Sequence, residues 1–455
     1  MDTQWAILLG TVYSLILLAY HLMVNHRSRF MGASNLFVIT QALLFFGTLS
    51  VRANVSADTY FRWIAIQLVG IVSFLVGAAA ANVFTHTNPR LAHESFLRRK
   101  LVFDMHSSTY WALMVLGVIS AVVGIVFSVR FGQHALIKTL RLYAQNSAST
   151  AIAYSMIRKS AVYGDVYFGY GYVMQFTDFL LPCFSCLLLF RANCRGKMYD
   201  RLALFLFMCV TLWCLTVTGR REPTLRYALC LCLVISTRYG VGLGSVLNRY
   251  WRKRIVAILV GAGIFFLLTN AVRYSTSVSI GYGLVQLWNR LGATLAEEKL
   301  RIMEFIFQQP TVCGQQWVDS LLTIVPGSHK PALSNQMHMM LYGSTGNAPL
   351  EFWGSTWYNF GWIGIMVLPF LVGIFLQWVT LSTLTGPKTA TRSVLLMMLS
   401  IQLASAIEPY HLLNNGIFAL WIVLIVTKFT RCFDNRILTE RRRGVSCHAE
   451  TCLPH

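Results

Sequence analysis

The chain has 455 residues, of which 56% are hydrophobic and 12% carry a formal charge, with a net charge of +21. Soluble domains contain about 25% charged residues, so this composition excludes an ordinary soluble protein and indicates one that is embedded in a membrane. Nucleic-acid binding would also explain a basic chain. Here, however, Lys and Arg gather in alternate connecting loops, which is typical of the cytoplasmic loops of membrane proteins.

Apolar runs of about 18 residues or more, enough to cross a hydrocarbon core of roughly 30 Å as helix, recur along the whole chain. We count about eleven predicted spans, at 4–24, 34–51, 63–83, 108–129, 167–190, 202–218, 224–238, 255–272, 357–381, 393–409 and 414–428. The first run has no basic segment before it and no cleavage site after it, so we interpret it as an anchor and not as a signal peptide. The sequence therefore predicts an all-α, polytopic membrane protein in which residues 1–455 form a single transmembrane domain.

The basic loops predict that the N-terminus lies outside and the C-terminus inside, with a cytoplasmic tail at 429–455. Their basic residues are Arg27 and Arg29; Arg90, Arg98, Arg99 and Lys100; Arg191, Arg195, Lys197 and Arg201; Arg249, Arg252, Lys253 and Arg254; Lys388 and Arg392; and those of the tail from Lys428 to Arg443. Two segments, 131–166 and 273–356, then lie outside. Both are longer than a connection between packed helices requires, so we expect them to bear function.

The two outer segments contain helical patterns of different kinds. In 131–166, apolar residues at helical intervals predict interfacial helices along the membrane surface. In the second segment, a helix is expected over 292–310, with an i,i+4 pair of Glu297 and Arg301 and an end at Pro310. Only Cys313 lies clearly outside, so no intramolecular disulfide is expected there. The cysteines and histidines of the tail match no zinc spacing well, and we predict neither a metal site nor a cofactor.

A charged stretch, TGRREPTLR at 218–226, separates two apolar runs where water is scarce. Glu222 and Arg226 are four residues apart and predict a pair across one helical turn. Asp178 and Glu408 are available as partners for the other arginines. Ion pairs that tie helices together are therefore one interpretation of this stretch.

The second interpretation is a phosphate pocket, because arginine grips phosphate oxygens in a bidentate manner better than lysine does. Several arginines at the outer membrane boundary suggest a lipid-linked phosphate or diphosphate as ligand. The predicted diphosphate-binding residues are Arg220, Arg221, Arg273, Arg158 and Arg141.

Short motifs cluster in the second outer segment and the span that follows it. They are IVP at 324–326, Lys330-Pro331, YGSTG at 342–346, Pro349 and GSTWYNFGWIGI at 354–365. On these motifs the run from Gly314 to Gly373 resembles the oligosaccharide repeat unit polymerases, the Wzy-type O-antigen polymerases of Gram-negative bacteria. The turn at 218–221 and Arg273 also fit that family. The chain departs from it at Gly327 and Ser355, where members often have Arg and Glu; Glu351 is a candidate substitute for the latter.

The resemblance implies a GT-C-like, metal-independent glycosyltransferase at the periplasmic face of the bacterial inner membrane. Its substrates would be oligosaccharides linked to undecaprenyl diphosphate, and a chain-length regulator is a possible partner; nucleic acid is not expected as one. A sugar hydroxyl that attacks an anomeric carbon needs a base, and a leaving diphosphate needs positive charge. We predict His338, Glu351 and Arg273 as catalytic residues, with Asp319 and Glu298 as further candidates for the base. The predicted sugar-binding residues are Tyr274, Trp353 and Tyr358.

Two other functions are compatible with the sequence. An O-antigen ligase, which moves finished glycan onto lipid A core, would use the same donor, topology and arginines. A flippase or transporter of lipid-linked oligosaccharides would use intramembrane charges along a path, but such proteins display internal repeats, and we find none here. A channel is disfavoured because no filter-like motif is visible.

Overall fold

The computed structural model describes most of the helical part of the chain. The described residues are 3–26, 28, 32–51, 55–99, 107–132, 134, 135, 137, 141, 173–220, 222–238, 256–258, 260, 261, 263, 294–322, 333–343, 348, 350–404, 416 and 418–429. The predicted interfacial helices of 131–166 and most of the predicted span at 255–272 lie outside them.

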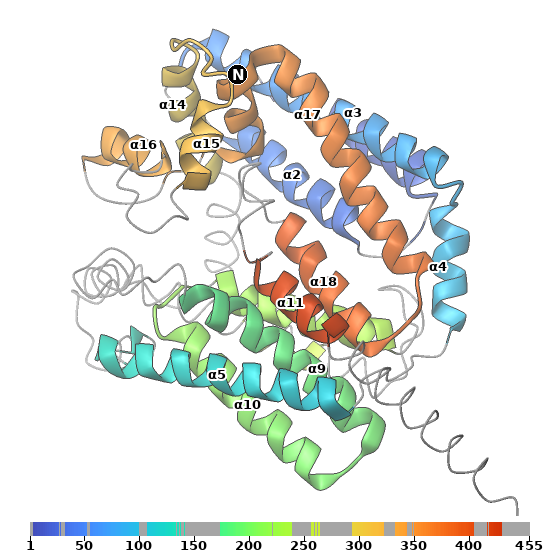
Figure 1. Cartoon of the computed structure of the whole chain (residues 1–455). Coiled ribbons are helices and arrows are strands. Elements are labelled where there is room, and N and C mark those ends of the chain that lie inside the picture. Colours follow the sequence, from blue (N-terminus) through green and yellow to red (C-terminus); the bar gives the residue numbers. More distant parts are fainter. Residues whose placement is uncertain are drawn as a thin grey trace, which may run out of the picture.

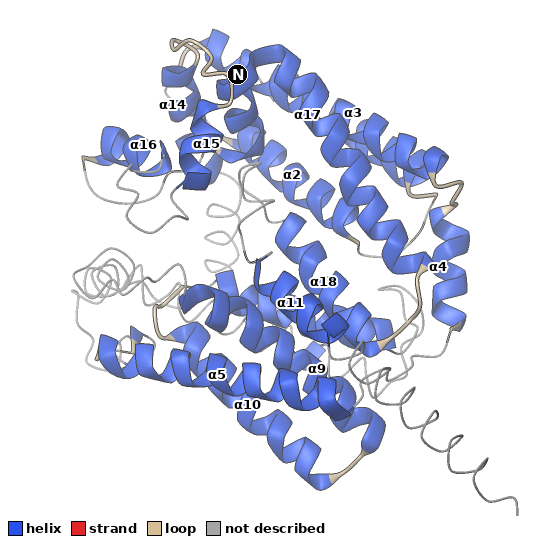
Figure 2. Cartoon of the chain, viewed as in Figure 1, coloured by secondary structure: helices blue, strands red, loops and turns tan. Residues whose placement is uncertain are grey.

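Helices are the only regular elements among the described residues (Figure 2). They are α1 (Thr3–Ala19), η1 (Tyr20–Val24), α2 (Ala33–Ser50), α3 (Ala57–Phe84), α4 (Pro89–Arg98), α5 (Ser107–Phe131), η2 (Gln175–Leu180), α9 (Leu181–Arg195), α10 (Met198–Thr216), α11 (Glu222–Arg238), α14 (Thr294–Ile306), α15 (Gln315–Leu322), α16 (Leu333–Tyr342), α17 (Glu351–Thr385) and α18 (Ala390–Ala404). The prediction of an all-α protein is confirmed for this part of the chain.

Among the residues that the structure describes, seven helices are long and apolar enough to cross a membrane. They are Gln4–Val24, Ala33–Ser50, Ala57–Phe84, Ser108–Phe131, Gln175–Ala192, Met198–Thr216 and Glu351–Thr385. Two further apolar helices, Ala390–Ala404 and Phe418–Phe429, are shorter. The chain is thus a membrane-embedded protein, and the count of eleven spans stays a prediction.

Among the described elements, the most extensive contact joins α3 to α17, which run side by side (Figure 1). Glycines make this approach possible: a Cβ on Gly77 would lie 1.9 Å from the carbonyl oxygen of Phe370, and one on Gly373 would lie 2.2 Å from that of Phe74. Helices in lipid associate through such small residues, because no hydrophobic force drives them together there.

A buried polar chain crosses the same part of the bundle. The Ser34 hydroxyl donates to Gln377 Oε1 (2.6 Å), the Gln377 amide donates to Asn82 Oδ1 (2.8 Å), and the Asn82 amide donates to the carbonyl oxygen of Val24 (2.6 Å). Each polar group has its partner on another element, so this series of hydrogen bonds fixes η1, α2, α3 and α17 relative to one another.

α17 is longer than the predicted span at 357–381. Its 35 residues exceed the roughly 20 that cross a bilayer, and it is kinked at Gly361, whose φ of 58° and ψ of −145° are not helical. The residues before the kink belong to the predicted outer segment. The boundary of that segment therefore falls inside a helix and not at a loop.

Three short helices, α14, α15 and α16, lie together at one end of the bundle, which we call the cap end (Figure 1). The backbone N–H of Ser56 donates to Glu304 Oε1 (2.9 Å) and so ties the start of α3 to α14. Glu297 and Arg301 form the predicted pair, with Oε1 and Nη2 2.7 Å apart. The far ends of α3 and α17 lie beside α4, and we call this the α4 end. The predicted topology puts the cap end outside.

Candidate functional site at the α10–α11 junction

The charged stretch forms a tight turn between two helices. α10 ends at Thr216, whose carbonyl oxygen accepts from the backbone N–H of Gly219 (3.2 Å). Gly219 has a φ of +69°, a left-handed conformation that favours glycine. α11 begins three residues later at Glu222. Arg220 therefore lies in the turn between two apolar helices, and Arg226 lies near the start of the second one.

The described side chains of this turn form a network of ion pairs. Arg220 Nη1 lies 3.2 Å from Asp178 Oδ2, and Arg220 Nη2 lies 3.5 Å from Glu222 Oε2. Glu222 also accepts from Arg226, and Arg226 Nη1 donates to Gln402 Oε1 of α18 (3.2 Å). We call these five residues the junction cluster.

Formal charges cancel within the junction cluster, since Arg220 and Arg226 face Asp178 and Glu222. The Asp178 side chain is only 9% exposed, whereas that of Glu222 is 47% exposed. The structure thus shows for Arg220 the ion pairs of the first interpretation, with carboxylates from η2 and α11, and its role in binding diphosphate stays a prediction. In this arrangement Arg220 alone is not an open phosphate ligand.

A small pocket opens beside Arg226, between η2, α9, α11 and α18. It is lined by Asp178, Pro182, Arg226, Tyr227, Cys230, Met398, Ile401 and Gln402. Arg226 Nε has no hydrogen-bond partner among the described residues. A half-buried guanidinium whose Nε donor has no described partner, beside a pocket, can bind an anionic oxygen. The sequence prediction omitted Arg226 from the diphosphate site, because its spacing from Glu222 already explained it.

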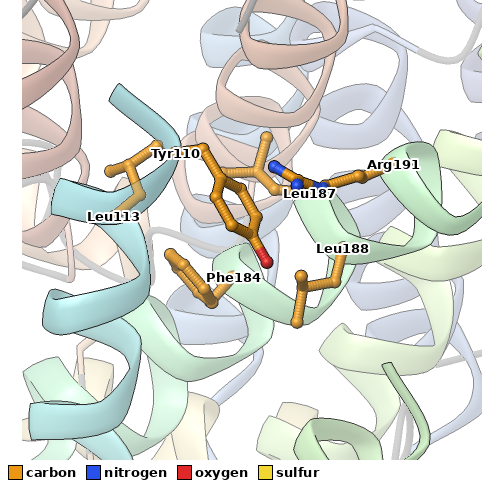
Figure 3. A pocket seen from close by; sticks show the side chains of 6 residues that line it. All are labelled: Tyr110, Leu113, Phe184, Leu187, Leu188 and Arg191. Carbon is orange, nitrogen blue, oxygen red and sulfur yellow. The ribbon is translucent and has the colours of Figure 1, made fainter. Parts of the chain in front are cut away.

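A second pocket contains an arginine, Arg191, that is engaged by side chains of neighbouring helices. Arg191 extends toward the ring of Tyr110 (Figure 3), with its guanidinium carbon 3.2 Å from the ring centroid. Arg191 Nε also donates to Asp200 Oδ1 (2.8 Å), and both side chains are buried. The rest of the lining is apolar, from Leu113, Phe184, Leu187 and Leu188. This arginine joins α5, α9 and α10.

Glu351 is the most unusual residue near the cap. It is the first residue of α17, it is 5% exposed, and its φ of +65° lies in the left-handed region that non-glycine residues seldom adopt. The buried ammonium of Lys299 on α14 acts on it electrostatically. Backbone strain together with a buried carboxylate is typical of functional positions, so Glu351 keeps its place among the candidate catalytic residues.

His338 lies on α16 and is half-buried, with its ring centroid 4.7 Å from that of Tyr342. α16 is tied to the segment before α17, because the backbone N–H of Ala348 donates to the carbonyl oxygen of Ser334 (2.9 Å). His338 is four residues after Ser334, one helical turn away. The cap therefore holds His338 and Glu351 on adjoining elements.

Trp353, predicted to bind sugar, lies in the core. It is 1% exposed, and a Cβ on Gly70 of α3 would lie 2.5 Å from its ring. It also contacts Phe37 of α2 at a centroid distance of 6.1 Å. Packing between three helices accounts for the position of this side chain, and its sugar-binding role stays a prediction.

The GSTWYNFG motif docks α15 onto α17. Trp317 Nε1 donates to Ser355 Oγ (2.8 Å), and the Asn359 amide donates to Gln316 Oε1 (2.7 Å). Tyr358, the other aromatic residue assigned to sugar, is half-buried, and its carbonyl oxygen accepts from the backbone N–H of Val312 (3.1 Å). These motif residues hold the cap against the kink at Gly361.

Several predicted site residues cannot be placed. Arg221, Arg273, Arg158 and Tyr274 lie outside the described residues, and Arg141 is exposed on an isolated described position. Of the further candidates for the base, Asp319 accepts from Gln315 Nε2 (2.9 Å) within α15. Cys313 is exposed and free. In the described part of the chain, no three His, Cys, Asp or Glu residues could together hold a metal.

Comparisons with family models, with curated proteins and with solved structures gave no match for this chain.

Proposed function

We propose that the protein is a glycosyltransferase that lengthens lipid-linked glycans, acting as an O-antigen polymerase at the periplasmic face of a bacterial inner membrane. It would transfer the growing chain from undecaprenyl diphosphate to the terminal sugar of the next lipid-linked repeat unit. The proposal is supported by the resemblance of residues 314–373 to that family and by the junction cluster. The observation that carries it is the pocket beside Arg226, whose Nε donor has no described acceptor.

The junction cluster suggests how a diphosphate could enter a site whose charges are already paired. Glu222 joins Arg220 and Arg226 and is half exposed, so its carboxylate occupies the position of a bridging anion. An incoming diphosphate, with more oxygens and more charge, would displace it and take both guanidinium groups. Asp178, more deeply buried, would keep Arg220 in place. Glu222 is thus a placeholder in the proposed mechanism.

The proposed reaction exchanges one bond at the anomeric carbon for another. A hydroxyl of the acceptor sugar gives its proton to a carboxylate or imidazole at the cap, from Glu351 or His338, and its oxygen bonds to the anomeric carbon of the donor. The bond from that carbon to the diphosphate breaks, and the electron pair leaves with the diphosphate. Arg226 and Arg220 stabilise the developing charge.

A test of the proposal compares glycan ladders made by variants in a strain that lacks the native gene. Arg226→Gln should reduce chain lengthening about a hundredfold, because it removes a donor to the leaving group. Glu222→Gln should retain most activity, because in the proposed mechanism Glu222 only occupies the anion position until the diphosphate displaces it. Arg62→Gln, which breaks an exposed pair with Asp58 on α3, is the matched control. Wild-type ladders from Arg226→Gln and Glu351→Gln would contradict the proposal.

The same strain separates the alternatives. Loss of a polymerase leaves lipid A core with one repeat unit, whereas loss of a ligase leaves core without any. Loss of a flippase leaves lipid-linked repeat units on the cytoplasmic face. A product ladder from the purified protein and lipid-linked repeat units would establish polymerisation directly and would show whether a chain-length regulator is needed.

A further inference from the structure

Three basic side chains meet at the α4 end, where α17 finishes. They are Arg99, directly after α4; Lys388, in the connection between α17 and α18; and Arg392, in the first turn of α18. Figure 1 shows α4 lying beside this end of α17. We call these three residues the α4 cluster.

The α4 cluster binds main-chain carbonyl oxygens. The pairs are Arg99 with Leu384, Thr385 (3.1 Å) and Gly386 (2.7 Å), Arg392 with Ser382 (2.9 Å), and Lys388 with Phe96 (3.2 Å). Four of these five carbonyls close the last turn of α17, whose helix dipole places about half a negative charge there. Two guanidinium groups and an ammonium therefore leave a large positive excess.

No carboxylate balances that excess among the described residues, because none of the three cations takes part in a salt bridge there. The Nε atoms of Arg99 and Arg392 are also without a hydrogen-bond partner in the same part of the chain. A cation cluster with spare donors and no counter-charge fits an anionic ligand.

Two neighbouring groups have pKa values that are lowered mainly by burial and, to a smaller extent, by the positive charges nearby. Burial, followed by the charge of Arg99, lowers the pKa of Lys388 from 10.5 to about 8. Burial lowers the pKa of His93 on α4, where Lys388 acts in the same direction and Glu94 in the opposite one. A phosphate bound here would offset the repulsion between Lys388 and Arg99.

An apolar stripe leads along α17 to the α4 cluster. Leu371, Phe375 and Trp378 are 52%, 40% and 52% exposed, and their spacing places them on one face of the helix with Ser382, the residue that Arg392 binds. Acyl chains can lie along this stripe while a headgroup reaches the cations. A free phosphate ion has no apolar group that could contact this stripe.

We propose that Arg99, Lys388 and Arg392 form a binding site for the phosphate of an anionic phospholipid, whose acyl chains lie along the exposed face of α17. Basic pockets between membrane helices bind lipid headgroups by this combination of charge and apolar contact. The site is separate from the junction cluster and does not depend on the proposed transferase activity.

The experiment uses the purified full-length protein in nonionic detergent, titrated with phosphatidylglycerol, with phosphatidylcholine and with inorganic phosphate. Bound lipid is counted by native mass spectrometry, and the apparent Tm is measured in parallel. We expect saturable binding of phosphatidylglycerol and a rise in Tm, with about tenfold weaker affinity in Arg99→Gln and in Arg392→Gln. Arg98→Gln, an exposed neighbour on α4, is the matched control and should bind as wild type.

Each other outcome overturns the proposal or part of it. Equal binding in all variants would remove the α4 cluster from the site, and equal binding of phosphatidylcholine would remove the need for net charge. Protection by inorganic phosphate alone, as strong as that by phosphatidylglycerol, would make this a free-phosphate site. Should Arg99→Gln fail to fold because α17 loses its cap, Lys388→Met and Arg392→Gln provide the same readout.

Discussion

The junction cluster and the α4 cluster both bring cations to the ends of membrane helices, but they neutralise them differently. At the junction, Arg220 and Arg226 face the carboxylates of Asp178 and Glu222. In the α4 cluster, the described partners of the cations are carbonyl oxygens and the ring of Phe96, with no carboxylate among them. The first cluster is balanced within the protein, and the second depends on helix dipoles, water or an external anion. A count of arginines does not separate a structural ion pair from a ligand site; the partner groups do.

The largest effect is expected from removing the buried carboxylate of the junction cluster. Asp178→Ala leaves Arg220 next to only the half-exposed Glu222, and breaking a buried pair in this way costs about 3 to 5 kcal/mol. Glu222→Ala should cost about 1 kcal/mol or less, because exposed ion pairs contribute little. The free energy of unfolding in mixed micelles measures both. Equal losses would mean that burial does not control the strength of these pairs.

Removing one cation from each cluster should change the free energy of unfolding by different amounts. Arg220→Met leaves Asp178 buried without its main partner, so we expect a loss of about 3 kcal/mol, the lower end of the range for a broken buried pair. Lys388→Met removes a buried ammonium that has no described carboxylate, together with one hydrogen bond to Phe96, so the change should lie within about 1 kcal/mol of zero. A large destabilisation by Lys388→Met, measured in lipid-free detergent, would reveal a counter-charge in the remainder of the chain.

The helical fold could be predicted because hydropathy and length decide which segments cross a membrane. The predicted spans at 34–51 and 108–129 differ from α2 and α5 by one or two residues at each end. The predicted span at 357–381 begins later than α17 because the first residues of this helix, EFWGSTWYNF, include Glu351, Ser355 and Asn359 and so do not continue the apolar run. Contacts with α15, which hydropathy does not register, accompany their helical conformation up to the kink at Gly361.

The candidate site was less predictable, because partners distant in sequence decide what a charge does. Asp178 precedes Arg220 by 42 residues, and the sequence could name it only as one possible partner. The sequence predicts sugar binding for Trp353, but aromatic residues occur both in sugar-binding sites and in packed cores. Its neighbour Gly70, which makes room for the ring, has no mark in the sequence that links the two.

Stability should rise with pH above about 8 through Lys388. Its folded pKa is lowered from 10.5 to about 8, so between those values the unfolded state binds more protons and alkali favours the folded state. Burial is the larger cause and the charge of Arg99 the smaller one; Lys388 in turn lowers the pKa of His93. We expect a gain of about 1 kcal/mol after solvent screening, measured as apparent Tm from pH 7 to 10.5. Lys388→Met should abolish this gain, and an unchanged slope in that variant would assign the titration to another group.

The smallest change in stability is expected from a substitution that displaces Arg392 within the α4 cluster. A Cβ on Gly386 would lie 2.4 Å from Arg392 Nη2, so Gly386→Ala should push the guanidinium away from the Ser382 carbonyl oxygen. The lost hydrogen bond should cost about 0.5 to 1.5 kcal/mol. In a double-mutant cycle with Arg392→Gln, the two losses should not add, because both remove the same contact. Gly386→Ala should also weaken phosphatidylglycerol binding. Additive losses together with unchanged lipid binding would mean that the substitution acts on the backbone of the connection and not on Arg392.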